Sequence, residues 1–317
     1  DPAEIYRFNW NSPFLMSPHD SNTIYLGGNK LFISEDGGEA WRATIDLTSQ
    51  LDREKLPLMN ILPDENTLSK HDGTLFYGTI STISESPLQK GLLYVGTDDG
   101  NLQLTKDGGE TWKNVTKNVP GIPERTYVSR IVASHHALGT AYATLDGHRN
   151  NDFKAYAFIT EDFGESWTDI SDNIPEGGTV NVIRGHHRNP NLLFVGTERG
   201  AYFSINKGNG WIKFTNDFPV VPIDDIAIHP RDNDLIFGTH GRSIWILEDI
   251  TPLEQLTVDA LDSPCYLFDI RPATLYNFFS RRAHYDFKGL FGHKIYRAPN
   301  PPYGAIISYY LKEKSRE

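Results

Sequence analysis

The chain has 317 residues, of which 38% are hydrophobic, 22% charged and 12% aromatic, a globular composition sufficient for one large domain or two ordinary ones. Its formal net charge of −11 argues against a nucleic-acid partner, because phosphate binding requires clustered Lys and Arg. No apolar run approaches the roughly 20 residues needed to span a bilayer, and the 27 glycines and 19 prolines favour many short strands over long helices.

A short motif recurs four times along the chain with the template S/T-x-D-x-G-x-S/T-W, from which Ala40 in the first copy and Asn206 and Gly210 in the degenerate fourth copy depart. An aspartate at its third position can accept hydrogen bonds from the backbone N–H groups that follow. Glycine at the fifth position permits positive φ, and the tryptophan can pack beside the next sheet. This is the chemistry of a tight hairpin, so we predict structural rather than catalytic roles for Asp36, Asp107, Asp162, Asn206, Trp41, Trp112, Trp167 and Trp211.

Short alternating segments surround each motif, so each repeated unit is predicted to contain four strands. Four short antiparallel strands with a glycine and aromatic signature in every unit are typical of β-propeller blades. The sequence therefore predicts an all-β fold, a β-propeller of four-stranded blades, of which five are visible. In chain order the expected blades are residues 4–46, 58–117, 122–172, 178–216 and 221–278.

The segments outside the clear repeats are predicted as follows. Residues 47–72 are polar, and we expect a surface loop there. The fifth blade lacks the motif; its expected third strand is 243–247, and its expected outer strand is 265–270, beginning with Cys265 as a packed strand residue. Residues 279–317 are expected to form an extension that starts a β-sandwich domain. We also expect a longer parent protein with further blades.

The four motifs resemble those of the BNR (Asp-box) β-propeller superfamily, which sialidases, xyloglucanase-type glycosidases and sortilin (VPS10) ectodomains share. Segments 91–100, 146–149 and 238–245 are most similar to bacterial sortilin-like proteins and to proteins described as glycosyl hydrolases with BNR repeats. This resemblance implies a secreted or periplasmic location and an Ig-like domain after the propeller. Enzymes and receptors both carry the motif, so it predicts the fold and leaves the activity open.

The turns between the second and third strands are the predicted functional surface. If the motif joins the third strand to the fourth, these turns project from the opposite face, beside the central channel, where ligand sites are expected. They hold the candidate catalytic carboxylates Asp98, Asp99, Asp146, Asp152 and Glu198. They also hold the candidate ligand-binding residues His148, Arg149, Tyr156, Arg199, His240 and Arg242.

Three functions fit this surface. We favour a non-catalytic binding or scaffold propeller that recognises a peptide, a protein or a glycan at the channel mouth. The alternative is a glycoside hydrolase, which needs two of the carboxylates at a separation of about 5–9.5 Å. An assembly factor or structural module of a larger envelope complex is a third hypothesis. Three arginines with a Tyr–Glu pair would also suit a sialidase, but that family's early Arg-Ile-Pro signature is not found in this sequence.

No cofactor or metal site is expected from the sequence. The histidines at 135–136 and 186–187 are adjacent in pairs, and neighbours on a strand point to opposite faces. Neither pair can therefore chelate one ion in a simple way.

Overall fold

The computed structural model describes residues 5–52, 55–57, 61–62, 64, 66–67, 77–175, 177–273, 275 and 303–313. The chain divides into two compact units, Asp1–Glu254 and Gln255–Glu317. Among the described residues, the first unit contains four four-stranded sheets and one three-stranded sheet, and the second unit contains one two-stranded sheet. Strand neighbours in these sheets pair in antiparallel fashion.

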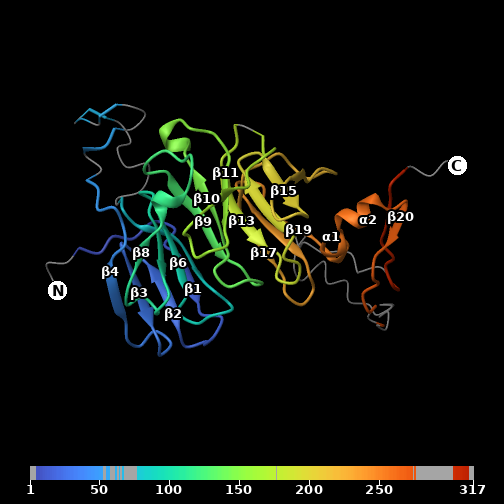
Figure 1. Ribbon diagram of the computed structural model, residues 1–317, viewed down its shortest axis with the longest axis horizontal. Helices are drawn as coiled ribbons and strands as arrows, with labels where there is room; N and C mark the ends of the chain where they lie inside the picture. The colour runs from blue at the N-terminus through green and yellow to red at the C-terminus, as the bar shows by residue number, and fades with distance from the viewer. Residues whose placement is uncertain are drawn as a thin grey trace, which may run out of the picture. The chain divides into compact units, whose positions relative to one another are not determined.

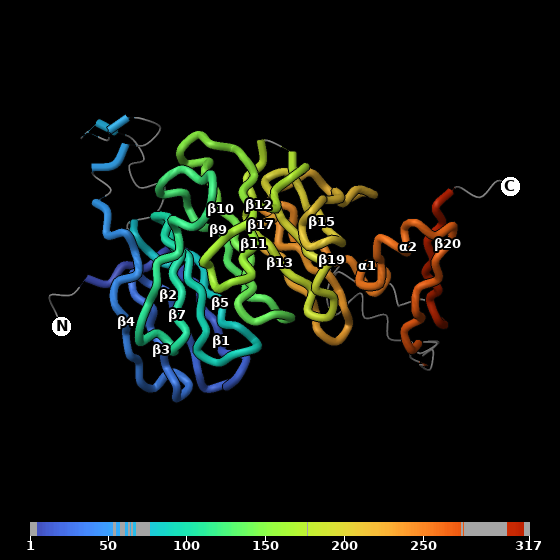
Figure 2. Tube along the Cα trace, viewed as in Figure 1, coloured from blue at the N-terminus to red at the C-terminus, as the bar shows by residue number. Residues whose placement is uncertain are grey.

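The five sheets of the first unit share one topology, in which the strands lie side by side in chain order. The strand bounds are, sheet by sheet, β1 (Phe14–Met16), β2 (Ile24–Gly27), β3 (Lys30–Ser34) and β4 (Arg42–Asp46); β5 (Ile80–Glu85), β6 (Leu93–Thr97), β7 (Leu102–Thr105) and β8 (Lys113–Asn114); β9 (Tyr127–Ala133), β10 (Ala141–Asp146), β11 (Tyr156–Thr160) and β12 (Thr168–Asp169); β13 (Val180–Gly185), β14 (Leu193–Thr197), β15 (Gly200–Ser204) and β16 (Ile212–Lys213); β17 (Ile223–Ile228), β18 (Leu235–Thr239) and β19 (Ile244–Leu247). The sheets follow one another from blue to orange in Figure 1, and the same path can be followed along the Cα trace in Figure 2.

The first strands of successive sheets lie against one another. On β9, Ser129 Oγ donates a hydrogen bond of 2.7 Å to Val180 O on β13. On β13, Arg184 Nε donates one of 2.7 Å to Ile226 O on β17. Sheets that contact through their first strands and extend outward in chain order are consecutive blades of a β-propeller. The predicted all-β propeller fold is therefore confirmed.

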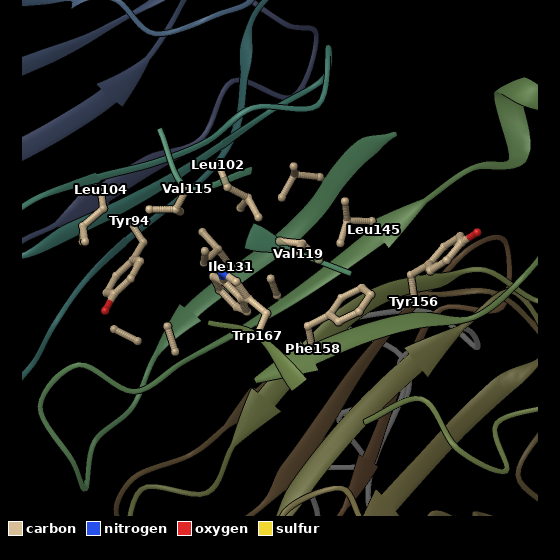
Figure 3. Packing of buried hydrophobic residues seen from close by; sticks show 14 of the residues in the cluster. Tyr94, Leu102, Leu104, Val115, Val119, Ile131, Leu145, Tyr156, Phe158 and Trp167 are labelled. Atoms are coloured by element: carbon tan, nitrogen blue, oxygen red, sulfur yellow. The ribbon is translucent and has the colours of Figure 1, made fainter. Parts of the chain in front are cut away.

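Hydrophobic side chains from facing sheets fill the space between the blades. Figure 3 shows the cluster between the second and third sheets, in which Tyr94, Phe158 and Trp167 are at most 6% exposed. The sheets approach so closely that Gly96 on β6 has no room for a side chain, because a Cβ there would lie 2.4 Å from the Val128 side chain. The glycine in the repeated strand therefore serves close packing between blades.

The fifth sheet differs from its prediction. Its third strand is β19, as expected, but the predicted outer strand at 265–270 is wrong. Its first residues form β20 (Cys265–Leu267), which pairs with β21 (Tyr309–Leu311) inside the second unit. After β19 the chain turns into the short helices α1 (Thr251–Gln255) and α2 (Val258–Asp262), and Pro252 at the start of α1 suits a first helical turn but not a continuing strand.

Other predictions concern the second unit and the loops. The first unit ends at Glu254, earlier than the predicted boundary at 278. Cys265 lies in a strand but is exposed rather than packed. The predicted loop at 47–72 is described only in part, and the predicted β-sandwich start at 279–317 falls largely outside the described residues. In the described part of the chain, no helix has the length and apolar character that a membrane span requires.

Candidate functional site

The repeated motif forms a turn at one end of each of the first four blades. In the second blade, Asp107 Oδ1 accepts hydrogen bonds from Thr105 Oγ1 at 2.6 Å and from Thr111 N at 2.9 Å, and Oδ2 accepts one from Thr111 Oγ1 at 2.5 Å. Asp162 makes the same set of contacts in the third blade. The hydroxyl of Thr105 lowers the pKa of Asp107, followed by the contacts from Thr111. Both carboxylates accept these hydrogen bonds from residues of their own turns, which fits the predicted structural role.

The motif tryptophans of the second, third and fourth blades pack toward the preceding blade. Trp167 contacts the cluster that holds Val115 and Val119 of the second blade. Trp211 is 4% exposed and donates a hydrogen bond of 2.7 Å to Ile170 O of the third blade. Trp41 in the first blade is 42% exposed. The exposure of this ring follows from its position, because no sheet precedes the first blade in the described chain.

Two of the predicted catalytic carboxylates, Asp98 and Asp99, lie at the β6–β7 turn and are buried. Asp98 is 5% exposed and accepts hydrogen bonds from Gly78 N, Thr79 N and Thr79 Oγ1 at 2.7–3.0 Å. Asp99 is 1% exposed and accepts from Thr97 Oγ1 and Ser49 N, and burial raises its pKa to about 6. A raised pKa suits a general acid, but neither carboxylate is exposed enough to touch a ligand. Both hold backbone segments in place.

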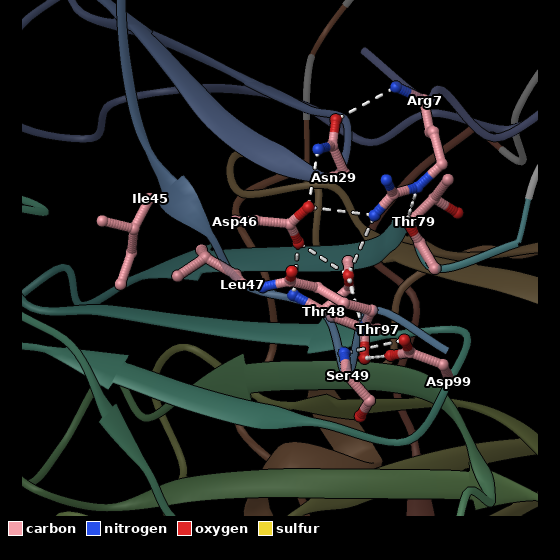
Figure 4. Close-up of polar contacts among 12 residues, drawn as sticks. Arg7, Asn29, Ile45, Asp46, Leu47, Thr48, Ser49, Thr79, Thr97 and Asp99 are labelled. Carbon is pink, nitrogen blue, oxygen red and sulfur yellow. Dashed lines mark hydrogen bonds and ion pairs between the residues drawn. The ribbon is translucent and has the colours of Figure 1, made fainter. Parts of the chain in front are cut away.

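A polar network that was not predicted from the sequence is centred on Arg7 and Asp46 and lies beside Asp99 (Figure 4). Arg7 forms an ion pair of 3.0 Å with Asp46, donates to Gly78 O, and donates to Thr48 Oγ1. Asn29 Nδ2 also donates to Asp46 at 2.8 Å. Asn29 lies in the β2–β3 turn of the first blade, which is equivalent to the β6–β7 turn that holds Asp99 in the second blade. This equivalence between turns is the sequence feature that points to Asn29 as a residue of the predicted surface. The network joins the first two blades at the end of the sheets that carries the turns between second and third strands, and this end is called the mouth below.

The third blade places an aspartate–histidine pair at the mouth. His148 Nδ1 lies 2.5 Å from Oδ2 of Asp146, and the His148 backbone N–H donates to the other carboxylate oxygen. Burial acts to raise the pKa of Asp146, but the contacts with His148 lower it overall. The hydrogen bond to Asp146 raises the pKa of His148, whose side chain is 48% exposed. The pair therefore presents an imidazole that gains a proton more readily than a free histidine.

Three neighbouring residues extend this part of the mouth. Glu198 on the β14–β15 turn is exposed and accepts a hydrogen bond of 3.1 Å from Asn181 Nδ2. Its charge is close enough to help raise the pKa of His148. Arg199 is also exposed, and its guanidinium lies over Gly177, where a Cβ would come within 3.0–3.1 Å of it. Arg149 lies 5.4 Å from the ring centre of Tyr127.

Asp152 and Tyr156 form a hydrogen-bonded pair with each other. Tyr156 OH donates a hydrogen bond of 2.7 Å to Asp152 Oδ2. Tyr156 is 6% exposed, and burial raises the pKa of its hydroxyl. The tyrosine therefore orients the carboxylate of Asp152, which is half-buried.

The fifth blade contributes exposed basic residues. His240 Nδ1 lies 3.4 Å from Asp224 Oδ2, and the His240 side chain is 79% exposed. Arg242 is exposed, and its carbonyl accepts a hydrogen bond from Trp245 Nε1. The predicted site thus separates into groups that are buried, Asp98 and Asp99 in the second blade with Asp146 and Tyr156 in the third, and groups that are exposed or half-buried in the third to fifth blades. Among the described residues, no group of three or more His, Cys, Asp or Glu side chains could hold a metal ion.

Comparisons with known proteins give weak sequence similarity and a fold match. No family model matches the chain. An oligoxyloglucan-reducing end-specific xyloglucanase from Emericella nidulans is 23% identical over 156 residues, which cover 48% of this chain and 16% of that protein. The structure of an ancestral GH74 enzyme matches 77% of this chain and 32% of that enzyme, with a TM-score of 0.50 and 15% identity. The chain therefore spans a sixth to a third of the length of these two proteins.

Two further solved structures have lower scores. The GH74 xyloglucanase from Xanthomonas campestris has a TM-score of 0.40 over 75% of this chain and 44% of that enzyme, at 15% identity. YCF48 bound to D1 peptide has a TM-score of 0.39 over 77% of this chain and 71% of that chain, at 15% identity. Together with the sheet topology, the match to the ancestral GH74 enzyme supports a β-propeller. The sortilin-like part of the resemblance stays a prediction.

Proposed function

We propose that the mouth of this propeller binds an oligosaccharide of the xyloglucan type, as part of a glycoside hydrolase. The observation that supports this proposal is the group of exposed residues around the Asp146–His148 pair, with Glu198 close to His148. Carboxylates, imidazoles and guanidinium groups hydrogen-bond sugar hydroxyls. The sequence similarity to an oligoxyloglucan-specific enzyme supports the choice of ligand.

Accessibility narrows the choice of carboxylates for hydrolysis. Asp98, Asp99 and Asp146 are at most 8% exposed, and each accepts hydrogen bonds from neighbouring residues. Glu198 is exposed and Asp152 is half-buried. Since glycoside hydrolysis requires carboxylates that reach the scissile bond, we assign Glu198 as the first candidate catalytic residue and Asp152 as the second.

The test combines binding with turnover. Xyloglucan oligosaccharides are titrated into the chain by calorimetry, and the release of reducing ends is followed with the same ligands. Glu198→Gln should keep binding and lower hydrolysis by about 10²–10⁴-fold, the usual contribution of a catalytic acid or base. Asp107→Asn, which changes a motif turn away from the mouth, is the control. A folded chain that binds none of these oligosaccharides would contradict the proposal.

A non-catalytic binding propeller is the second candidate function. The observation that favours it is the loss of three of the five predicted carboxylates to contacts within the protein. In that case the chain should bind its ligand without releasing reducing ends, and Glu198→Gln should alter affinity alone. The secreted or periplasmic location implied by the family resemblance accompanies both proposals.

A further inference from the structure

The turn between the first and second strands has one position that is equivalent in all five blades. The residue there follows the first strand and donates its backbone N–H to the carbonyl just before the second strand. In the first three blades it is Ser17, Ser86 or Ser134, whose hydroxyl accepts a hydrogen bond of 3.0–3.2 Å from the amide two residues on. Serine therefore suffices to close this turn, but the fourth and fifth blades have His186 and His229 there.

The fourth blade closes its turn with the imidazole of His186, a residue that is 1% exposed. The ring Nδ1 accepts hydrogen bonds of 3.2 Å from the backbone amides of Arg188 and Asn189. A ring nitrogen that accepts a hydrogen bond carries no proton, so the proton of the neutral ring is on Nε2. Nε2 donates a hydrogen bond of 2.9 Å to Asn233 Oδ1 in the fifth blade. These contacts fix the neutral ring in one tautomer and use both of its nitrogens.

The hydrogen bond to Asn233 connects the turn of the fourth blade to the β17–β18 turn and to α1. Asn233 is 1% exposed, and its Nδ2 donates to Glu254 Oε2 at 2.8 Å. Glu254 also accepts a hydrogen bond of 2.8 Å from Arg188 Nη2, and its carbonyl accepts one of 2.6 Å from Asn189 Nδ2. A serine side chain ends at the hydroxyl that closes its own turn. Histidine at this position therefore adds a contact between blades that serine does not supply.

Protonation would disrupt this arrangement, because a proton on Nδ1 would turn the acceptor of the two turn amides into a donor that faces them. Burial is the largest effect on His186 and lowers its pKa, and the charges of His187 and Arg188 act in the same direction. The hydrogen bond to Asn233 and the carboxylate of Glu254, 3.8 Å from Nε2, act in the opposite direction. The pKa is lowered overall, so the fold favours the neutral ring.

We propose that His186 is a pH-sensitive switch at the contact between the fourth and fifth blades. The neutral ring closes its own turn and binds Asn233, whereas the protonated ring no longer accepts the two turn amides, and the contact with the β17–β18 turn and α1 loosens. Because the folded-state pKa is lowered, the contact stabilises the fold above the unfolded-state value of about pH 6.5, and the stabilisation is lost as the pH falls below that value.

The switch lies at the end of the blades that carries the motif turns. Asn191, in the same turn as His186, accepts a hydrogen bond of 3.0 Å from the amide of Lys207 in the fourth motif. The pair of Asp146 and His148 at the mouth responds to pH with the opposite sign, because the pKa of His148 is raised. Acid should therefore loosen the motif end while this pair keeps its contact. The proposal is independent of oligosaccharide binding.

Hydrogen exchange of the intact chain between pH 8 and pH 5, followed by NMR, tests the switch in the native protein. If opening takes up one proton, the opening constant should rise by up to about tenfold for each pH unit below about 6.5, after correction for the intrinsic exchange rate. We expect this rise at the amide of His186. We also expect it at the amide of Ile250, which donates a hydrogen bond of 2.8 Å to Asn233 O.

The amide of Ser86 is the internal control in the same experiment. The carbonyls of Ser86 and His186 each accept a hydrogen bond of 2.8 Å from a histidine of the preceding blade, His19 and His136 respectively. The two turns therefore differ chiefly in the side chain at the equivalent position, and the corrected opening constant at Ser86 should stay constant with pH. An equal rise at Ser86 and His186 would overturn the proposal, as would a pKa of His186 at or above about 6.5 in the ring NMR signals.

Two variants separate the pH response from a purely structural contact. His186→Ser introduces the residue of the first three blades, so the amide of Ile250 should exchange rapidly at pH 8 and change no further at pH 5. Glu254→Gln removes the charge that favours the protonated ring, so the rise in exchange should begin at a lower pH. His19→Gln is the control and should leave the response at Ile250 unchanged. Circular dichroism establishes that each variant is folded. A pH response that persists in His186→Ser, or that begins at a higher pH in Glu254→Gln, would refute the assignment.

Discussion

Replacing Trp211 by alanine removes a ring that packs the fourth blade against the third. The ring is 4% exposed, and its Nε1 donates a hydrogen bond of 2.7 Å to Ile170 O. A buried aromatic side chain covers about 150–250 Å², which corresponds to ~4–6 kcal/mol at about 25 cal/mol per Å². Measured losses for such truncations are about 3–5 kcal/mol. At this chain length, that loss should lower the midpoint of thermal unfolding by about 6–20 °C.

The matched control is Trp41→Ala in the first blade. Trp41 occupies the same position of the motif and donates its Nε1 hydrogen to Gly38 O, but the residue is 42% exposed. Because 42% of this residue is exposed, we expect a loss of only ~1 kcal/mol in the free energy of unfolding. Both variants are compared by urea denaturation and by thermal melting, followed by circular dichroism. Equal losses for the two variants would refute the inference that the motif tryptophans act by joining blades.

Three further predictions concern the motif turns and the mouth. Asp107→Ala should lower the midpoint of unfolding and leave oligosaccharide affinity unchanged. Arg242→Ala should do the reverse, with affinity about tenfold lower and stability unchanged. His148 has a raised pKa and Asp146 a lowered one. Their pairing should therefore stabilise the fold from about pH 4 to about pH 6.5 and lose its effect as the pH rises through the folded-state pKa of His148. Melting curves of His148→Gln against pH test this, and a constant difference from the native chain would contradict it.

The fold could be predicted from the sequence because its determinants are local. The contacts of Asp107 lie within one eight-residue motif, so the repeat carries its own turn geometry. The mouth depends instead on distant contacts. Asp98 is bound by Thr79, and Asp99 by Ser49, which are 19 and 50 residues away in sequence. Spacing alone cannot show which of several carboxylates such loops will cover, so the sequence could not predict which carboxylates are accessible.

The predicted outer strand of the fifth blade was wrong because it, too, had no local sequence determinant. Its outer strand was expected at 265–270 because every other blade has one, yet no motif precedes that segment. Without the motif turn, nothing local returns the chain to the edge of β19, and a helix begins at Thr251 instead. The motif therefore indicates a fourth strand where it is present, and its absence from the fifth blade is evidence against one.

The side chains at the two ends of each blade differ in how far they are used in contacts within the fold. This difference decides which substitutions can identify the function. At the motif end, carboxylates and tryptophans are used inside the fold, so their replacement changes stability first. At the mouth, the buried Asp98 and Asp99 behave in the same way, and their removal would lower activity by loosening the loops they hold. Glu198 is exposed, and its carboxylate accepts a hydrogen bond from Asn181. A loss of turnover in Glu198→Gln at unchanged stability would therefore reflect chemistry rather than folding.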